Sequence, residues 1–240
     1  MKKILTVLTI SSLMVAFLAA SSWAYTYGFT NITSNSTDNA TTGESQLFLD
    51  ITDAGDSQAL FTFWNSLDPG NPSSITQIYF ENNGLLLDDI ISVDGSDGVE
   101  YLIAGRAGNL PGGNDLDPKF DADFEIYPDQ PTAPNGINPG ESLDVLFSII
   151  GSFDDLIAAL ESEDQNNNMR VGFHVQAFGD GGSEAFVNNL VAVIEKATPG
   201  DTGPSPNPGT GGGTVPEPAT MFLFIVGLVG LTVLKKKFNK

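Results

Sequence analysis

Residues 47–51 read Leu-Phe-Leu-Asp-Ile, and residues 59–64 read Ala-Leu-Phe-Thr-Phe-Trp. Both runs are short, rich in aliphatic and aromatic residues, and separated by Gly, Asp and Ser, which is typical of β-strands joined by turns. Runs of the same kind recur at 75–80, 85–93, 99–104, 143–150, 170–178 and 185–194. Strands at this spacing predict an all-β fold, an antiparallel β-sandwich of jelly-roll-like type.

The alternation within residues 59–64 separates its aromatic side chains between two faces. Phe61 and Phe63 point to one side of a strand and Trp64 points to the other. At least one of these two sets therefore belongs to the core. Aromatic rings on an exposed face, with Tyr79 as a further candidate, would form a stacking platform for sugars. Carbohydrate binding is thus expected without an assigned face.

One short helix is well signalled in the sequence. Ser152 and Asp155 are spaced as an N-terminal capping pair. An apolar stripe at i, i+3, i+4 and i+7 follows, formed by Phe153, Leu156, Ile157 and Leu160. We expect this helix to close one end of the sandwich.

Residues 31–42 are rich in Ser, Thr and Asn and predict a solvated loop. They contain three Asn-x-Ser/Thr sequons, which begin at Asn31, Asn35 and Asn39. Such sequons are glycosylation acceptors in secreted eukaryotic proteins. The plainer interpretation here is a polar loop between early strands.

The stretch from residue 105 to residue 142 is rich in Pro, Gly and Asp and predicts a long loop, with 120–126 as its one candidate strand. Loops of this length are uncommon unless they are functional or clamped by a ligand. Five acidic residues alternate within it, namely Asp115, Asp117, Asp121, Asp123 and Glu125. Calcium takes six to eight oxygen ligands, so these residues are calcium candidates, although their spacing is not that of an EF-hand. The turn between Asp94 and Asp97 is a weaker candidate, and no other cofactor is expected.

The charge of the chain restricts its partners. Only four of its ten basic residues lie between Tyr25 and Thr214, against 29 carboxylates, so this part carries a net charge of −25. Such a surface repels polyphosphates, which excludes nucleic acid and disfavours anionic lipid headgroups. The chain has no cysteine, so disulfides, thiol nucleophiles and Cys-ligated metals are excluded as well.

No catalytic residues are expected. The single histidine, His174, alternates with Val171, Phe173 and Val175, so it faces away from the core as a structural or surface residue. Two alternatives remain open. One is a secreted carbohydrate-active enzyme, which needs two carboxylates converging in a cleft. The other is a calcium-dependent carbohydrate-binding module, which calcium would stabilise.

The N-terminus has the three parts of a secretory signal peptide, assigned to residues 1–24. Lys2 and Lys3 precede an apolar segment at 4–20, and small residues flank Trp23. We expect cleavage before Tyr25, which leaves one domain at 25–196. Residues 197–214 are rich in Pro, Gly and Thr and predict a flexible tether.

The last 26 residues predict a membrane segment. Val215, Pro216, Glu217 and Pro218 precede an uncharged apolar run at 219–234, and lysines dominate the tail at 235–240. As a helix the run would span about 24 Å, and flanking lysines can snorkel to reach the interface of a core of about 30 Å. The lysines place the C-terminus in the cytoplasm and everything before the run outside.

This order of parts resembles the PEP-CTERM sorting signal of bacterial envelope proteins. Residues 138–143 and 171–188 also look like the β-rich ectodomain of many proteins with that signal, with Pro-Gly-Glu-Ser before one strand and Gly-Phe-His-Val-Gln leading into an Asp-Gly-Gly-Ser turn. The resemblance implies recognition of Val215 to Pro218 by an exosortase-type enzyme and association with extracellular polysaccharide. The membrane-anchored domain would then reach the cell surface or the extracellular matrix. Such tails usually end in arginine, whereas this one ends in lysine, so positive charge is retained.

Overall fold

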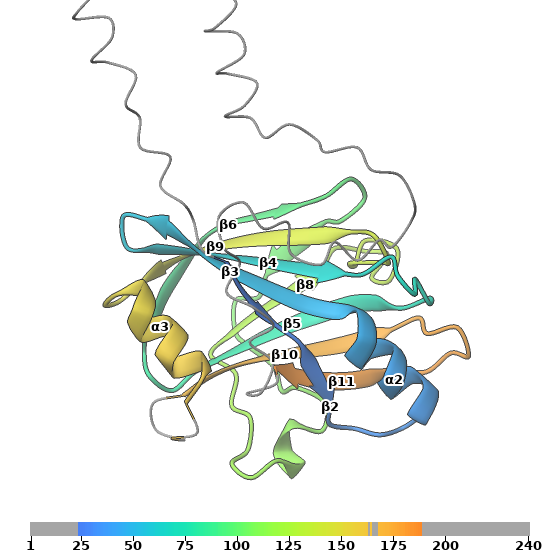
Figure 1. Cartoon of the computed structure of the whole chain (residues 1–240). Helices are drawn as coiled ribbons and strands as arrows, with labels where there is room; N and C mark the ends of the chain where they lie inside the picture. The colour runs from blue at the N-terminus through green and yellow to red at the C-terminus, as the bar shows by residue number, and fades with distance from the viewer. Residues whose placement is uncertain (1–23, 163, 165–167, 189–240) are drawn as a thin grey trace, which may run out of the picture. The chain divides into compact units, whose positions relative to one another are not determined.

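The computed structural model describes residues 24–162, 164 and 168–188, which form two antiparallel β-sheets (Figure 1). Sheet A contains, in spatial order, β1 (Ala24–Tyr27), β3 (Leu47–Gly55), β4 (Gln58–Asn65), β9 (Ser142–Ile149) and β6 (Leu87–Gly95). Sheet B contains β2 (Phe29–Asn31), β11 (Glu184–Asn188), β10 (Met169–Gln176), β5 (Ser74–Asn82), β8 (Phe124–Pro128) and β7 (Tyr101–Ile103). The predicted antiparallel β fold is therefore confirmed.

The core lies between the two sheets and follows the alternation of the strands. In β4 and β9 every second residue is buried, and Phe61, Phe63 and Phe147 are fully enclosed. Phe80 of sheet B meets all three of these rings edge to face, with centroids 4.9–5.9 Å apart. Edge-to-face contacts place the positive rim of one ring on the negative face of another. Aromatic packing thus joins the sheets.

The first described strands close the sandwich along one side. Tyr27 pairs with Leu49 in sheet A, and Phe29 pairs with Asn188 in sheet B. The chain therefore passes from one sheet to the other at Gly28. Tyr27 and Phe29 are both buried, so this crossing segment seals the core.

The predicted helix is present as α3 (Phe153–Leu160). Ser152 and Asp155 form a reciprocal capping box, and Leu156 and Leu160 are fully buried. The helix packs against β10, and its Phe153 contacts Tyr25 of β1. No helix in the described part of the chain is long and apolar enough to cross a membrane.

The prediction of a single helix was wrong, because α2 (Thr37–Gln46) forms where a solvated loop was expected. This helix has no apolar stripe, and its Ser36 cap accepts a hydrogen bond from the Asn39 backbone. Gly43 faces the buried ring of Phe186, so α2 approaches sheet B without a side chain between them. Figure 1 shows α2 beside β2 and β11, at the end of the sandwich opposite α3.

The three sequon asparagines attach this region to the β10–β11 hairpin. The side-chain amide of Asn31 donates to Ala185 O and to the Glu184 carboxylate. The side-chain amide of Asn35 donates to Ser183 O, and that of Asn39 donates to Gly181 O. The four-residue repeat of asparagine is thus explained by contacts within the protein.

Glu184 is the acceptor at the centre of this attachment. Its side chain is buried and accepts from the backbone amides of Asn35 and Ser36 and from the side chains of Asn31 and Thr33. Burial opposes ionisation, but these hydrogen bonds outweigh it and lower the pKa of the Glu184 carboxyl. The charged carboxylate therefore stabilises the entry to α2.

Replacing Glu184 with Gln is expected to lower the free energy of unfolding by about 1–2 kcal/mol at neutral pH, because charge-assisted hydrogen bonds are lost. A carboxyl whose folded pKa is lowered contributes stability above its unfolded pKa of about 4.3 and loses it as the pH falls through the folded value. The difference between wild type and Glu184→Gln should therefore shrink below about pH 4. Urea unfolding of both proteins across this range measures it, and a difference that stays constant with pH would contradict the assignment.

The long loop is ordered by packing on the outer face of sheet B. Leu110 and Phe120 are buried there with Tyr79, Ala185 and Val187. Gly172 of β10 lies beneath them, and a Cβ at that position would come within 2.6 Å of a Leu110 methyl group. Apolar packing thus holds the loop on this path. Its candidate strand at 120–126 is displaced to β8, and a 3-10 turn, η1 (Gly113–Asp115), precedes it.

The remaining strand predictions agree with the structure to within a few residues, except that the run predicted for 185–194 is described only to Asn188. The predicted signal peptide except Ala24, the tether and the C-terminal membrane segment lie outside the described residues.

Candidate functional site

The outer face of sheet A is the candidate site, and it is called the open face below. It is formed by the alternate side chains of its five strands that point away from the core, and those on β3, β4 and β9 are half-buried. The two helices pack elsewhere, α2 against β2 and β11 and α3 against β10. Sheet B, by contrast, is covered by the loop that carries Leu110 and Phe120.

An aromatic pair occupies one part of the open face. Phe48 of β3 and Trp64 of β4 are direct cross-strand partners, and their rings stack with centroids 4.4 Å apart and planes 22° apart. Trp64 Nε1 donates a hydrogen bond of 3.1 Å to Asp50 Oδ2. The indole is therefore fixed in orientation by a stacking partner and a hydrogen bond, which suits a rigid platform.

Polar side chains form a row across all five strands beside this pair. The register aligns Thr26, Asp50, Thr62, Asp144 and Asp94 as successive cross-strand partners. Thr26 donates to Asp50, and Thr62 donates to Asp144 Oδ1 at 2.6 Å. Burial raises the pKa of Asp50, and the hydrogen bonds from Thr26 and Trp64 offset this only in part.

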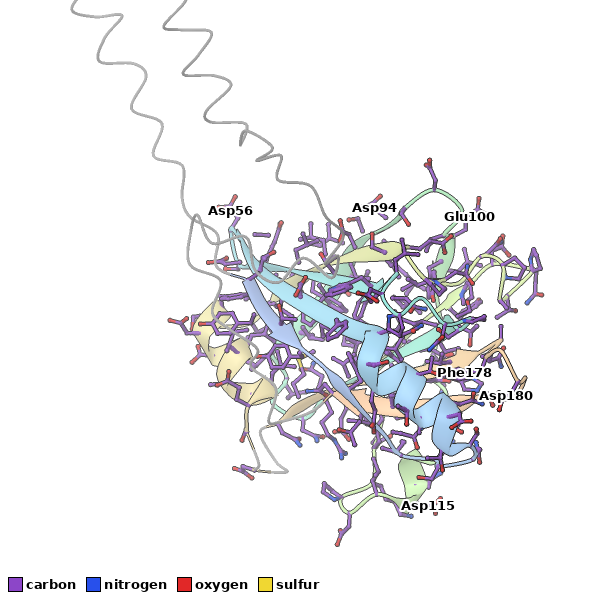
Figure 2. All side chains as sticks on the ribbon, turned by 45° about the vertical axis from the view of Figure 1, so that its right-hand side comes forward. Asp56, Asp94, Glu100, Asp115, Phe178 and Asp180 are labelled. Carbon is purple, nitrogen blue, oxygen red and sulfur yellow. The ribbon has the colours of Figure 1, made fainter. Side chains whose placement is uncertain are left out.

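The carboxylates of Asp94 and Asp144 lie directly opposite each other on β6 and β9. Like charges in this position destabilise a sheet. Among the described residues no donor reaches Asp144 Oδ2 or the Asp94 carboxylate. Figure 2 shows Asp94 at the surface of the molecule, where a ligand can reach it.

The outer face of sheet B carries a different polar set. Arg170 of β10 forms a two-pronged ion pair with Glu81 of β5, the one salt bridge in the described part of the chain. Its guanidinium also donates to the carbonyl oxygens of Pro118 and Lys119 and lies 5.2 Å from the ring centre of Phe120. These contacts clamp the long loop onto sheet B and engage the Arg170 guanidinium.

His174 belongs to a chain of hydrogen bonds on the same sheet. Gln77 Nε2 donates to Glu125 Oε1 at 3.0 Å, and Gln77 Oε1 therefore accepts from His174 Nδ1 at 2.8 Å. Burial lowers the pKa of His174. Glu125 Oε2 in turn accepts from the backbone of Gly108. The chain joins β10, β5, β8 and the loop, which is a structural role.

The proposed calcium residues are not gathered into one group. Asp115 ends η1 and Asp117 is exposed, whereas Asp123 Oδ2 accepts from Asn82 N and Glu125 is held by Gln77 and Gly108. The backbone amide of Asp121 donates a hydrogen bond to Glu81 Oε1. Within the described residues no three His, Cys, Asp or Glu side chains are placed to share a metal ion. Calcium binding in this loop stays a prediction that the geometry does not favour.

The sequence placed Trp64 correctly on the face opposite Phe61 and Phe63, and both phenylalanines are core residues. Tyr79 is buried under the loop and offers no platform. Phe48, Asp50 and Asp144 were missed, although the same alternation assigns each of them to an outer face. Their meeting with Trp64 depends on the β3–β4 and β4–β9 pairings, which the alternation alone does not supply.

The PEP-CTERM protein-sorting motif matches residues 214–237 of the chain. This span includes the Val215 to Pro218 tetrapeptide, the apolar run at 219–234 and three lysines, all outside the described residues. The roles of Pro216, Glu217 and Pro218 in recognition stay a prediction. A search of curated proteins found no match. The motif implies export, sorting by an exosortase and a C-terminal membrane anchor for a chain whose described part is a two-sheet antiparallel β domain.

Proposed function

We propose that this protein is a non-enzymatic component of the cell envelope or extracellular matrix that binds extracellular polysaccharide through its open face. The sorting motif delivers the β domain to the exterior, and residues 197–214 act as a tether that holds the domain clear of the membrane. The main support for this proposal is the fixed Phe48–Trp64 pair. It is bordered by hydrogen-bonding side chains and lies on a sheet face that no described helix covers.

The chemistry of this face suits a carbohydrate. A sugar ring presents C–H groups to an aromatic plane, and its hydroxyls donate to carboxylate and threonine oxygens. Trp64 supplies the aromatic plane. Thr62 supplies a hydroxyl oxygen on the same strand, and Asp144 supplies a carboxylate on the neighbouring strand β9. The net charge of −25 between Tyr25 and Thr214 makes nucleic acid an unsuitable partner.

The position of the carboxylates on one sheet face supports binding without hydrolysis. Asp50 and Asp144 share the row but lie two strands apart, about 10 Å at a strand spacing of about 4.8 Å. This is at the upper limit of the separation of about 6.5–9.5 Å found between the carboxyl groups of inverting glycosidases, whereas Asp94 and Asp144 lie closer, on adjacent strands. Both pairs project side by side from one sheet face, instead of flanking a sugar from opposite sides as the carboxyl groups of a glycosidase do.

The test is binding of the purified domain, residues 25–196, to extracellular polysaccharide isolated from the producing cells. Truncation of Trp64 in the Trp64→Ala variant is expected to weaken binding at least about tenfold, because a central aromatic anchor is lost. Trp64→Phe keeps a ring but loses the hydrogen bond to Asp50, and should retain part of the affinity. Tyr127→Ala, on sheet B, removes an exposed aromatic ring from another surface and should leave binding unchanged.

The melting temperature of each variant distinguishes lost binding from lost folding. Equal binding by wild type and Trp64→Ala, with both folded, would contradict the open face as the site. Release of reducing sugar from the polysaccharide would contradict the non-enzymatic part of the proposal.

A further inference from the structure

We propose that the polysaccharide bound by the open face carries free amines, as an amino-sugar polymer does when part of its acetyl groups has been removed. This inference rests on the proposed function and names the class of polymer that the same face would take. The inference is based on two neighbouring features of the open face, the fixed aromatic pair Phe48–Trp64 and the negative charge beside it, which is unpaired among the described residues.

The open face has carboxylates and no cation. Asp50, Asp144 and Asp94 lie in one row across sheet A. The basic side chains within the described residues all belong to sheet B or to the loop that covers it: Arg106, Lys119 and Arg170. An anionic polysaccharide would meet only repulsion on this face, whereas a cationic one is complementary to it.

Two of the three carboxylates have acceptor capacity to spare. Asp50 already accepts from Thr26 and Trp64, so it orients the indole. Asp144 accepts through Oδ1 alone among the described residues, and Asp94 faces it across the ladder. An ammonium group has three hydrogen-bond donors and no acceptor. Placed between these carboxylates, it would donate to their free oxygens and relieve their mutual repulsion.

The register brings this charge within reach of a stacked sugar. Asp144 pairs with Thr62, and Trp64 lies two residues further along β4, so Asp144 and Trp64 are diagonal neighbours. Such neighbours are about 7–8 Å apart. A sugar ring that stacks on Trp64 can therefore direct an amine substituent toward Asp144 while the next ring of the polymer passes Asp94.

The experiment compares two probes of equal length and linkage, an oligomer of glucosamine and its fully N-acetylated counterpart, which differ only in the amines. Binding to the folded domain is measured by calorimetry below the pKa of the sugar amine. We expect the glucosamine oligomer to bind more tightly. Asp144→Asn, which keeps an acceptor for Thr62, should weaken its binding about tenfold and leave the acetylated oligomer unaffected.

The matched control is Asp56→Asn, which removes the same charge elsewhere. Asp56 is exposed at the tip of the β3–β4 turn, far from Asp94 in the view of Figure 2, and its positive φ of 50° is one that asparagine tolerates. If both variants weaken binding equally, general attraction to an acidic protein explains the result and this inference is overturned.

The remaining outcomes separate this inference from the proposed function. If both oligomers bind equally and only Trp64→Ala abolishes binding, the amine assignment is wrong while polysaccharide binding by the open face stands. If neither oligomer binds, although the isolated native polysaccharide does, the amine assignment is again wrong. If no polysaccharide binds at all, both proposals fall together.

Discussion

Gly43→Ala is expected to destabilise the domain by about 2–3 kcal/mol, although alanine is the better helix former. A Cβ at this position would lie 2.1–2.9 Å from three ring atoms of Phe186. The ring is fully buried in the core and has little room to move. Overpacking of this kind should outweigh the gain of about 1 kcal/mol that Gly→Ala gives in an exposed helix. The melting temperature should fall by roughly 5–10 °C.

The control for this change lies on the same helix. Thr42→Ala removes a half-buried side chain without filling the space beside Phe186, and its effect should stay within about 0.5 kcal/mol. Adding Phe186→Leu to Gly43→Ala makes room for the new methyl group, so the double variant should lose less than the sum of the two single changes. Stabilisation by Gly43→Ala alone would show that α2 does not sit this close to sheet B.

The contrast between α2 and α3 shows what the sequence could reveal. The α3 helix has a local cap and an apolar stripe, so residues within one turn of each other determine it. The α2 helix has neither stripe nor strong propensity, and its start is held by Glu184, which lies 148 residues from Ser36 in the chain. Local patterns do not reveal contacts of such sequence separation, and the polar segment was therefore interpreted as a loop.

The open face shows the same division. Alternation along each strand assigns Trp64 and Asp144 to outward-facing positions, and this much can be read without a structure. Their proximity arises because β4 pairs with β9, whose residues lie about 80 positions further along the chain. The long loop is a further case. The close contact of Leu110 with Gly172 can be recognised only when β10 and the loop are placed together. Which residues come into contact depends on the pairing of segments that are distant in the chain, and this pairing cannot be predicted from the alternation within each segment.

Arg170→Met is expected to lower the free energy of unfolding by about 3–5 kcal/mol, the largest effect predicted for a single change in this domain. Glu81 has 1% of its side chain exposed and Arg170 has 12%, so removal of the guanidinium leaves a charged carboxylate buried without its partner. The change also removes two hydrogen bonds to the loop carbonyl oxygens at Pro118 and Lys119 and the contact with Phe120. Chemical denaturation at neutral pH measures the loss.

A double variant separates the two causes. Arg170→Met combined with Glu81→Gln removes the buried charge as well as its partner, so much of the loss should be recovered if the unpaired carboxylate dominates. The part that is not recovered reports the loop contacts, and limited proteolysis should then cut first within residues 104–123. Glu81→Gln alone keeps the hydrogen bond to Asp121 N and should cost less than Arg170→Met. An Arg170→Met protein as stable as wild type, with the loop still protected, would mean that the apolar contacts of Leu110 and Phe120 are sufficient to hold the loop on sheet B.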